Sequence, residues 1–161
     1  MRREPVTACI ALGANLGDAR ATVARAVRDL RVLPQTRVQA VSRLYRTAPH
    51  EASGPDFINA VVKVMTDLTA PALLQALQSL EQAAGRERPY RHAPRTLDLD
   101  LLFYGDARID SPALTVPHPR WRERAFVLHP LADVAPERVS AADLLAVQDQ
   151  AIAVVAPQEN A

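Results

Sequence analysis

The fold is decided by the stretch Thr96-Leu97-Asp98-Leu99-Asp100-Leu101-Leu102-Phe103-Tyr104. Apolar and polar side chains alternate along it, and this period of two predicts a β-strand. Two aspartates, Asp98 and Asp100, point from one face of that strand, with Cα atoms about 6.5–7 Å apart. The opposite face is expected to be apolar and to carry Leu97, Leu99, Leu101 and Phe103. The pattern therefore predicts a strand with one face in a core and the other face available for chemistry.

Two helices are predicted before this strand. Asp18 and Thr69 are of the residue types that cap helix N-termini, and Gly85 is of the type that ends a helix. The first helix has an apolar stripe formed by Val23, Val27 and Leu30, and the second has one formed by Leu73, Leu77, Leu80 and Ala84. Such spacing indicates that each helix packs one side against a sheet.

Three more strands are predicted over 6–12, 37–46 and 57–65, and Val41 and Tyr45 stand at even spacing within the second of these. The resulting order is typical of the α+β ferredoxin-like βαββαβ fold, with two helices packed on a mainly antiparallel sheet. We expect the other face of that sheet to stay free for a site. We also expect a single domain over 1–161, whose tail from about residue 148 carries little signal.

Composition limits the classes of function. The 161 residues carry a formal net charge of +1, which gives no global electrostatic case for binding nucleic acid or a membrane. The single cysteine, Cys9, lies in an apolar run, so we expect a buried free thiol in a reducing compartment. The sequence thus predicts a cytoplasmic protein that acts on small molecules, and a monomer is expected.

A basic loop precedes the two aspartates. It contains Arg86, Arg88, Arg91 and Arg95, interrupted by prolines. Paired carboxylates suit Mg²⁺, and guanidinium groups suit phosphate oxygens, so together they are typical of a site for a magnesium-bound triphosphate. A solvated strand face and a solvated basic loop are the alternative reading of these residues taken alone.

A longer stretch around the aspartates, Arg91-His92-Ala93-Pro94-Arg95-Thr96-Leu97-Asp98-Leu99-Asp100-Leu101-Leu102, resembles the signature of the 6-hydroxymethyl-7,8-dihydropterin pyrophosphokinases, enzymes of folate biosynthesis. Further segments resemble the family in the same order: 10–17, 45–47, 57–60 and 114–118, with similarity continuing to about Pro136. The resemblance implies transfer of pyrophosphate from ATP to the hydroxymethyl group of the pterin, with AMP as the second product.

The resemblance also implies roles for individual residues. Asp98 and Asp100 would hold two Mg²⁺ ions, and Arg86 and Arg95 would contact the phosphates and assist the transfer. ATP or its phosphates would be contacted by Gln78, Glu81, Thr115, His118 and Arg124. The pterin would be bound by Thr47, Ala48, His50, Phe57, Asn59 and Phe126, with the two phenylalanines sandwiching its ring and Asn59 hydrogen-bonding its edge.

The sequence departs from the family pattern in places. Many members have Trp where His92 stands and Tyr where Phe57 stands, and some have Arg near Ala113 and Tyr at Pro119. Three other functions are open: a ferredoxin-like RNA-binding module, a nucleotidyltransferase that attaches AMP, and a relative that binds nucleotide without catalysis. The acid pair argues against the first, because carboxylates on the sheet face would repel RNA phosphates in the absence of metal.

Overall fold

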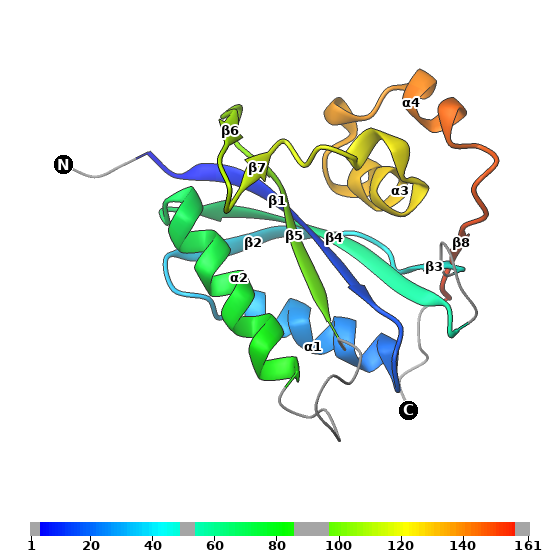
Figure 1. Cartoon of the computed structure of the whole chain (residues 1–161), viewed down its shortest axis with the longest axis horizontal. Coiled ribbons are helices and arrows are strands. Elements are labelled where there is room, and N and C mark those ends of the chain that lie inside the picture. The colour runs from blue at the N-terminus through cyan, green and yellow to red at the C-terminus, as the bar shows by residue number, and fades with distance from the viewer. Residues whose placement is uncertain (1–3, 49–53, 86–96, 157–161) are drawn as a thin grey trace.

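The computed structural model describes residues 4–48, 54–85 and 97–156 (Figure 1). A six-stranded sheet has the order β5-β1-β4-β3-β8, and β2 also pairs with β4. The strands and helices up to β5 are β1 Val6–Ala14, α1 Ala19–Arg31, β2 Thr36–Val41, β3 Tyr45–Thr47, β4 Phe57–Thr66, α2 Ala70–Gly85 and β5 Asp98–Tyr104. They are followed by β6 Ile109–Asp110, β7 Thr115–Val116, η1 Trp121–Glu123, α3 Ala125–Val134, η2 Pro136–Arg138, α4 Ala141–Ala146 and β8 Ala153–Val154. The predicted ferredoxin-like arrangement is confirmed, and the strand pairs of this sheet are antiparallel.

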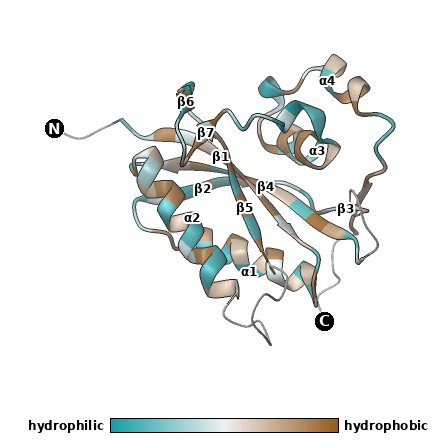
Figure 2. Cartoon of the chain, viewed as in Figure 1, coloured by the Kyte–Doolittle hydropathy of each residue, from teal (hydrophilic) through white to brown (hydrophobic). Residues whose placement is uncertain are grey.

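The two predicted helices begin where their caps indicate. The Asp18 carboxylate accepts a hydrogen bond from the Ala21 N–H at 3.0 Å, and the Thr69 hydroxyl accepts one from the Ala72 N–H at 3.2 Å. Each bond satisfies a donor that the first turn of a helix leaves without an intrahelical acceptor. Hydrophilic and hydrophobic residues alternate along both helices in Figure 2, as amphipathic packing against a sheet requires.

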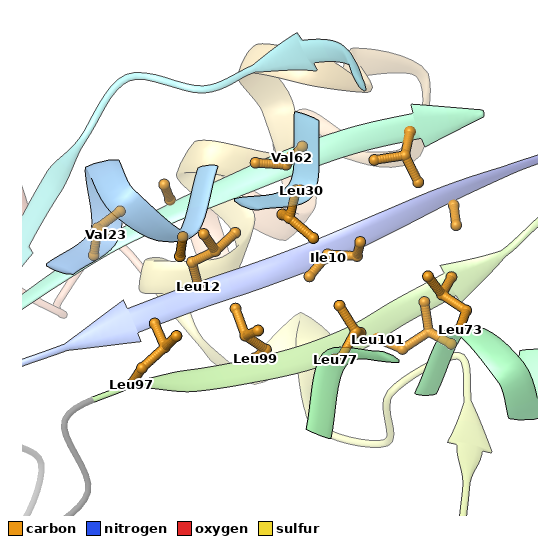
Figure 3. Packing of buried hydrophobic residues seen from close by; sticks show 14 of the residues in the cluster. Ile10, Leu12, Val23, Leu30, Val62, Leu73, Leu77, Leu97, Leu99 and Leu101 are labelled. Atoms are coloured by element: carbon orange, nitrogen blue, oxygen red, sulfur yellow. The ribbon is translucent and has the colours of Figure 1, made fainter. Parts of the chain in front are cut away.

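One face of the sheet packs against α1 and α2. We call this the inner core, and its largest fully buried side chains include Ile10, Val23, Leu30, Val62, Leu73 and Leu77 (Figure 3). The apolar face of β5 also joins it, because Leu97, Leu99 and Leu101 are buried there. The inner core therefore fixes which face of β5 is turned away from the two helices and carries the aspartates.

The second face of the sheet is not free, contrary to expectation. Residues of η1, α3 and α4 and the segment after α4 pack over it and form an outer core with Cys9, Val61, Leu102, Phe103, Trp121, Leu128 and Leu131 among its members. The apolar side of α3 needs burial, and the sheet face beneath it is apolar at these positions. Cys9 is buried as predicted, and burial raises the pKa of its thiol to about 11.

A β-bulge overturns the predicted orientation of Phe103. The register of β1 against β5 shifts between Cys9, which pairs with Phe103, and Ile10, which pairs with Leu101. One extra residue, Leu102, is thus inserted, and everything beyond it changes face. Phe103 consequently packs in the outer core, with its ring centroid 4.9 Å from that of Trp121, instead of beside Leu101.

The predicted strand 37–46 is also divided. Ser42 interrupts it and makes two hydrogen bonds to Val61 of β4. The Ser42 backbone N–H donates to the Val61 carbonyl, and the Ser42 hydroxyl accepts from the Val61 N–H. After this break the chain resumes as β3 with the other face turned, so Val41 packs against the inner core while the Tyr45 hydroxyl bonds Asp133 of α3. The even spacing of Val41 and Tyr45 therefore did not place them on one face.

Asp133 ties α3 to the β2–β3 region. Its carboxylate accepts from the Tyr45 hydroxyl at 2.8 Å and from the Arg43 guanidinium at 2.9 and 3.2 Å. Burial opposes ionisation of Asp133, but the hydrogen bonds from Arg43 and Tyr45 outweigh it and hold the pKa of the carboxyl below its usual value. This contact fixes α3 over the strand that carries Tyr45 and Thr47.

Replacing Asp133 by Asn is expected to lower the free energy of unfolding by about 1 kcal/mol, because the buried Tyr45 hydroxyl loses a charged acceptor. The exposed Asp110, which lies in the β6–β7 hairpin, provides the matched control Asp110→Asn, with an expected change near zero. A carboxyl with a lowered folded pKa stabilises the protein above its unfolded pKa and ceases to do so as it is protonated. The gap between wild type and Asp133→Asn in urea unfolding should therefore be full at neutral pH and shrink below pH 3.8; a gap independent of pH would contradict the assignment.

Candidate active site

Three residues from three strands form a row across the sheet. Gly13 of β1 pairs with Asp98 of β5 on one side and with Asn59 of β4 on the other. Directly opposed residues of antiparallel strands point to the same face, so this row faces the α3 side of the sheet. The next row on that face contains Asp100, Ala11 and Val61. The row therefore has an acidic end, formed by Asp98 with Asp100, and an amide end, formed by Asn59. The two ends are separated by two strand spacings, which places the Cα atoms of Asp98 and Asn59 about 10 Å apart.

Gly13 leaves the middle of the row open. A Cβ at this position would stand 3.3 Å from the Asn59 Oδ1 atom, which is tighter than ordinary contact. The positive-φ glycines are Gly17, Gly54 and Gly105, so the backbone at Gly13 does not itself require glycine. We conclude that glycine is needed here because a larger side chain would fill the space above the sheet. The side-chain oxygen of Asn59 borders this space on one side, and Asp98 lies on the other.

The acidic end lies at the exposed beginning of β5, where Asp98 and Asp100 are both exposed. Between them, the Leu99 N–H donates to the Glu81 Oε2 atom of α2 at 2.8 Å. Among the strands that the structure describes, β5 pairs only with β1, so this bond satisfies a backbone donor on its outer edge. Glu81 thus holds the backbone between the two aspartates, while Gln78 lies exposed one turn earlier on α2.

The amide end is built by β3 and β4. Asn59 is 4% exposed, and its side-chain nitrogen donates to the Thr47 hydroxyl at 2.9 Å. Thr47 pairs with Phe57 across the strands, and Phe57 lies two residues before Asn59 on the same face. Ala48 follows Thr47 and is exposed. The hydrogen bond fixes the Asn59 amide, so that its oxygen is presented to the gap above Gly13.

The start of α3 supplies the wall above the sheet. Arg124 is its N-cap residue, and the guanidinium carbon lies 5.4 Å from the centroid of the Phe126 ring. Phe126 is half-buried against the outer core. Both predicted ring-binding residues, Phe57 and Phe126, are therefore on the α3 side of the sheet.

His118 lies close to the acids. Its backbone N–H donates to the Leu102 carbonyl at 3.0 Å, which fixes it beside β5. Burial lowers the pKa of its imidazole, the positive charges of Arg124 and Arg120 lower it further, and the negative charge of Asp100 opposes them. The lowered pKa favours the neutral imidazole, which can act as a hydrogen-bonding group beside Asp100. Thr115 is exposed in β7, which packs against β5.

The comparisons with known proteins agree with this geometry. The model of the family "7,8-dihydro-6-hydroxymethylpterin-pyrophosphokinase" matches residues 9–136, which include every residue described in the row and its walls. This chain belongs to that family. It is therefore a pyrophosphokinase, and the resemblance seen in the sequence is confirmed.

Relatives within this pyrophosphokinase family are similar over most of the chain. The 2-amino-4-hydroxy-6-hydroxymethyldihydropteridine pyrophosphokinase of Pseudomonas aeruginosa is 46% identical over 129 residues, 80% of each protein. Its counterpart in Synechocystis is 41% identical over 132 residues, 82% of this chain and 68% of the relative. A solved Plasmodium falciparum HPPK-DHPS structure has a TM-score of 0.65 at 14% identity, covering 83% of this chain and 40% of that one. That likeness shows the shared fold.

Some expected residues of this pyrophosphokinase lie outside the described segments. Arg86, Arg95 and His50 belong to 86–96 and 49–53, so their roles stay predictions. Among the described residues, the structure brings together Asp98, Asp100, His118 and Arg124 at one end and Thr47, Phe57 and Asn59 at the other. The sequence did not indicate the open position at Gly13. That position lies between Asn59 and Asp98 only because β1 pairs with both β4 and β5.

Proposed function

We propose that the row of Asp98, Gly13 and Asn59 is the floor on which this chain transfers pyrophosphate from ATP to 6-hydroxymethyl-7,8-dihydropterin, a step of folate biosynthesis. The single observation that carries the proposal is the separation of a carboxylate end from an amide end by a strand position without a side chain. A flat pterin has hydrogen-bonding edges that suit the amide, whereas a triphosphate with metal suits the carboxylates.

Asp98 and Asp100 are proposed to hold two Mg²⁺ ions, with which ATP binds. Within the described residues, no group of three or more His, Cys, Asp or Glu side chains is placed to hold a metal. Two exposed carboxylates fit Mg²⁺, which usually takes one or two protein carboxylates and completes its octahedron with water and substrate phosphates. Held by these carboxylates, Mg²⁺ would neutralise phosphate charge and so lower the barrier to attack on phosphorus.

The protein groups around the acids are proposed to align the triphosphate. Glu81 keeps the backbone between the aspartates in place through the Leu99 N–H. His118 and Arg124 lie on the α3 side near Asp100, where an imidazole and a guanidinium provide donors for phosphate oxygens. Gln78 and Thr115 flank this end, and Arg86 and Arg95 are proposed to join them from the basic loop.

The amide end is proposed to orient the pterin. Phe57 and Phe126 contact its two ring faces, the Asn59 amide bonds its edge, and Thr47, Ala48 and His50 line the rest of the pocket. The hydroxymethyl oxygen then attacks the β-phosphorus of ATP, the bond from that phosphorus to the α–β bridging oxygen breaks, and AMP leaves. The hydroxyl proton passes to solvent. Positioning supplies most of the rate enhancement in such a transfer.

The remaining properties concern location, RNA binding and assembly. No helix of the described residues is long and apolar enough to cross a membrane. Asp98 and Asp100 on the open sheet face disfavour an RNA ligand, as the sequence indicated. We propose a cytoplasmic monomer with small-molecule substrates.

The products of the reaction test the proposed function. Incubation with ATP, Mg²⁺ and 6-hydroxymethyl-7,8-dihydropterin is expected to yield AMP in step with a diphosphorylated pterin, both measured by chromatography. Asp98→Asn and Asp100→Asn should lose at least about 100-fold in rate if each removes a metal ligand, whereas Asp29→Asn on α1, across the sheet, should retain the wild-type rate. ADP would indicate an ordinary kinase and free pyrophosphate a nucleotidyltransferase; either product contradicts the proposal.

Gly13→Ala tests the division of the site. The added Cβ crowds the Asn59 oxygen, so pterin affinity should fall about fivefold, the equivalent of about 1 kcal/mol for a disturbed hydrogen bond, while affinity for a non-hydrolysable Mg·ATP analogue changes little. The backbone at position 13 accepts Ala, so any loss of unfolding stability should come from the Asn59 contact alone. In an Asn59→Ala background, calorimetry should show little further loss from Gly13→Ala; two losses that simply add would rule out the crowding of Asn59.

A further inference from the structure

The segment 139–156 lies beyond the residues that the family model matches, and it contacts both walls of the proposed pterin pocket. We propose that this segment acts as a strap that sets the position of Phe126 relative to β3, with Gln150 as its principal positioning residue. The inference rests on the proposed function for the identity of the ligand, but the contacts of the strap are independent of it.

Gln150 caps the start of α3. Its Oε1 atom accepts from the Ala125 N–H at 2.8 Å, and its Nε2 atom donates to the Glu123 carbonyl at 2.8 Å. Ala125 is the first residue of α3, so its N–H has no acceptor within the helix, and the N-cap Arg124 makes no side-chain capping bond. Gln150 therefore bonds the backbone on both sides of Arg124, and one of its two partners, Ala125, directly precedes Phe126.

The same segment continues the sheet beside β3. Ala153 and Val154 of β8 pair with Arg46 and Tyr45, and the Val155 N–H donates to the Leu44 carbonyl at 2.8 Å. Figure 1 shows β8 alongside β3 at the edge of the sheet. Val155 is 9% exposed and packs in the inner core. β3 in turn carries Thr47, whose hydroxyl holds the Asn59 amide.

The strap therefore spans from one wall to the other within a few residues. Only Ala151 and Ile152 separate Gln150 from β8, and Ile152 packs against the outer core. Beyond β8, the Arg20 guanidinium of α1 donates to the Ala156 carbonyl at 2.5 Å, which anchors the end of the strap. Near its C-terminus, α3 is attached to the sheet by the contacts of Asp133 with Tyr45 and Arg43. Gln150 supplies a second attachment, which fixes the start of the helix over the sheet.

Gln150→Ala and Gln148→Ala form a matched pair. Both remove the same side chain from the full-length protein, but Gln148 is exposed and its side chain makes no hydrogen bond among the described residues. Calorimetry with 6-hydroxymethyl-7,8-dihydropterin in the presence of a non-hydrolysable Mg·ATP analogue should show about fivefold weaker binding for Gln150→Ala, from one lost capping bond. Gln148→Ala should bind as the wild type does.

A second measurement tests the strap without any ligand. Amide exchange followed by NMR should show faster exchange of the Ala125 N–H in Gln150→Ala than in wild type or Gln148→Ala, while amides in the middle of β1 stay unchanged. A merely stabilising role would raise exchange throughout the protein and leave pterin affinity intact at temperatures well below unfolding. A wild-type protein that fails to bind pterin refutes the proposed function, whereas equal pterin affinity in the two glutamine variants refutes the strap alone.

Discussion

The antiparallel register of β1 between β4 and β5 is the constraint on which the site depends. Gly13 pairs with Asp98 and Asn59 at once, so a shift of one residue in either pairing would turn one of these side chains into the inner core. Burial of Ile10, Leu12, Leu99 and Leu101 on that side makes such a shift costly. The inner core therefore stabilises the fold and also keeps the Asp98 carboxylate and the Asn59 amide on one face of the sheet.

The outer face of the sheet is divided between packing and chemistry. Where the face is apolar, around Cys9, Val61 and Phe103, η1 and α3 cover it; where it carries Gly13, Asp98 and Asp100, it is partly or fully exposed. The bulge at Leu102 marks this boundary on β5, because it turns Phe103 toward Trp121 and leaves the aspartates ahead of it on the open part. The site is thus the part of the outer face that α3 does not bury.

The sequence predicted the elements well where the signal was local. The caps at Asp18 and Thr69, the alternation of Asp98 and Asp100 and the ferredoxin-like order all follow from neighbouring residues, and they were confirmed. What failed depends on distant partners: the bulge that turns Phe103 depends on β1, and the break at Ser42 depends on Val61 of β4. Likewise, nothing near Gln150 or Glu81 in the sequence indicates that they bond the backbone of Ala125 and Leu99.

The division of the row into a metal end and a pterin end can be tested by locating the metal directly. Mn²⁺ in place of Mg²⁺, added with a non-hydrolysable ATP analogue, broadens NMR signals of nearby nuclei with a steep dependence on distance. The account predicts the strongest broadening at the amides of Asp98, Asp100 and Gly13 and weaker broadening at the Asn59 side chain. Broadening should decline further along β1 and β4 past Lys63 and be least at Val6 and Thr66, which pair at the other end of the sheet. Broadening centred on Lys63, or equal at the Asn59 side chain and Asp98, would contradict it.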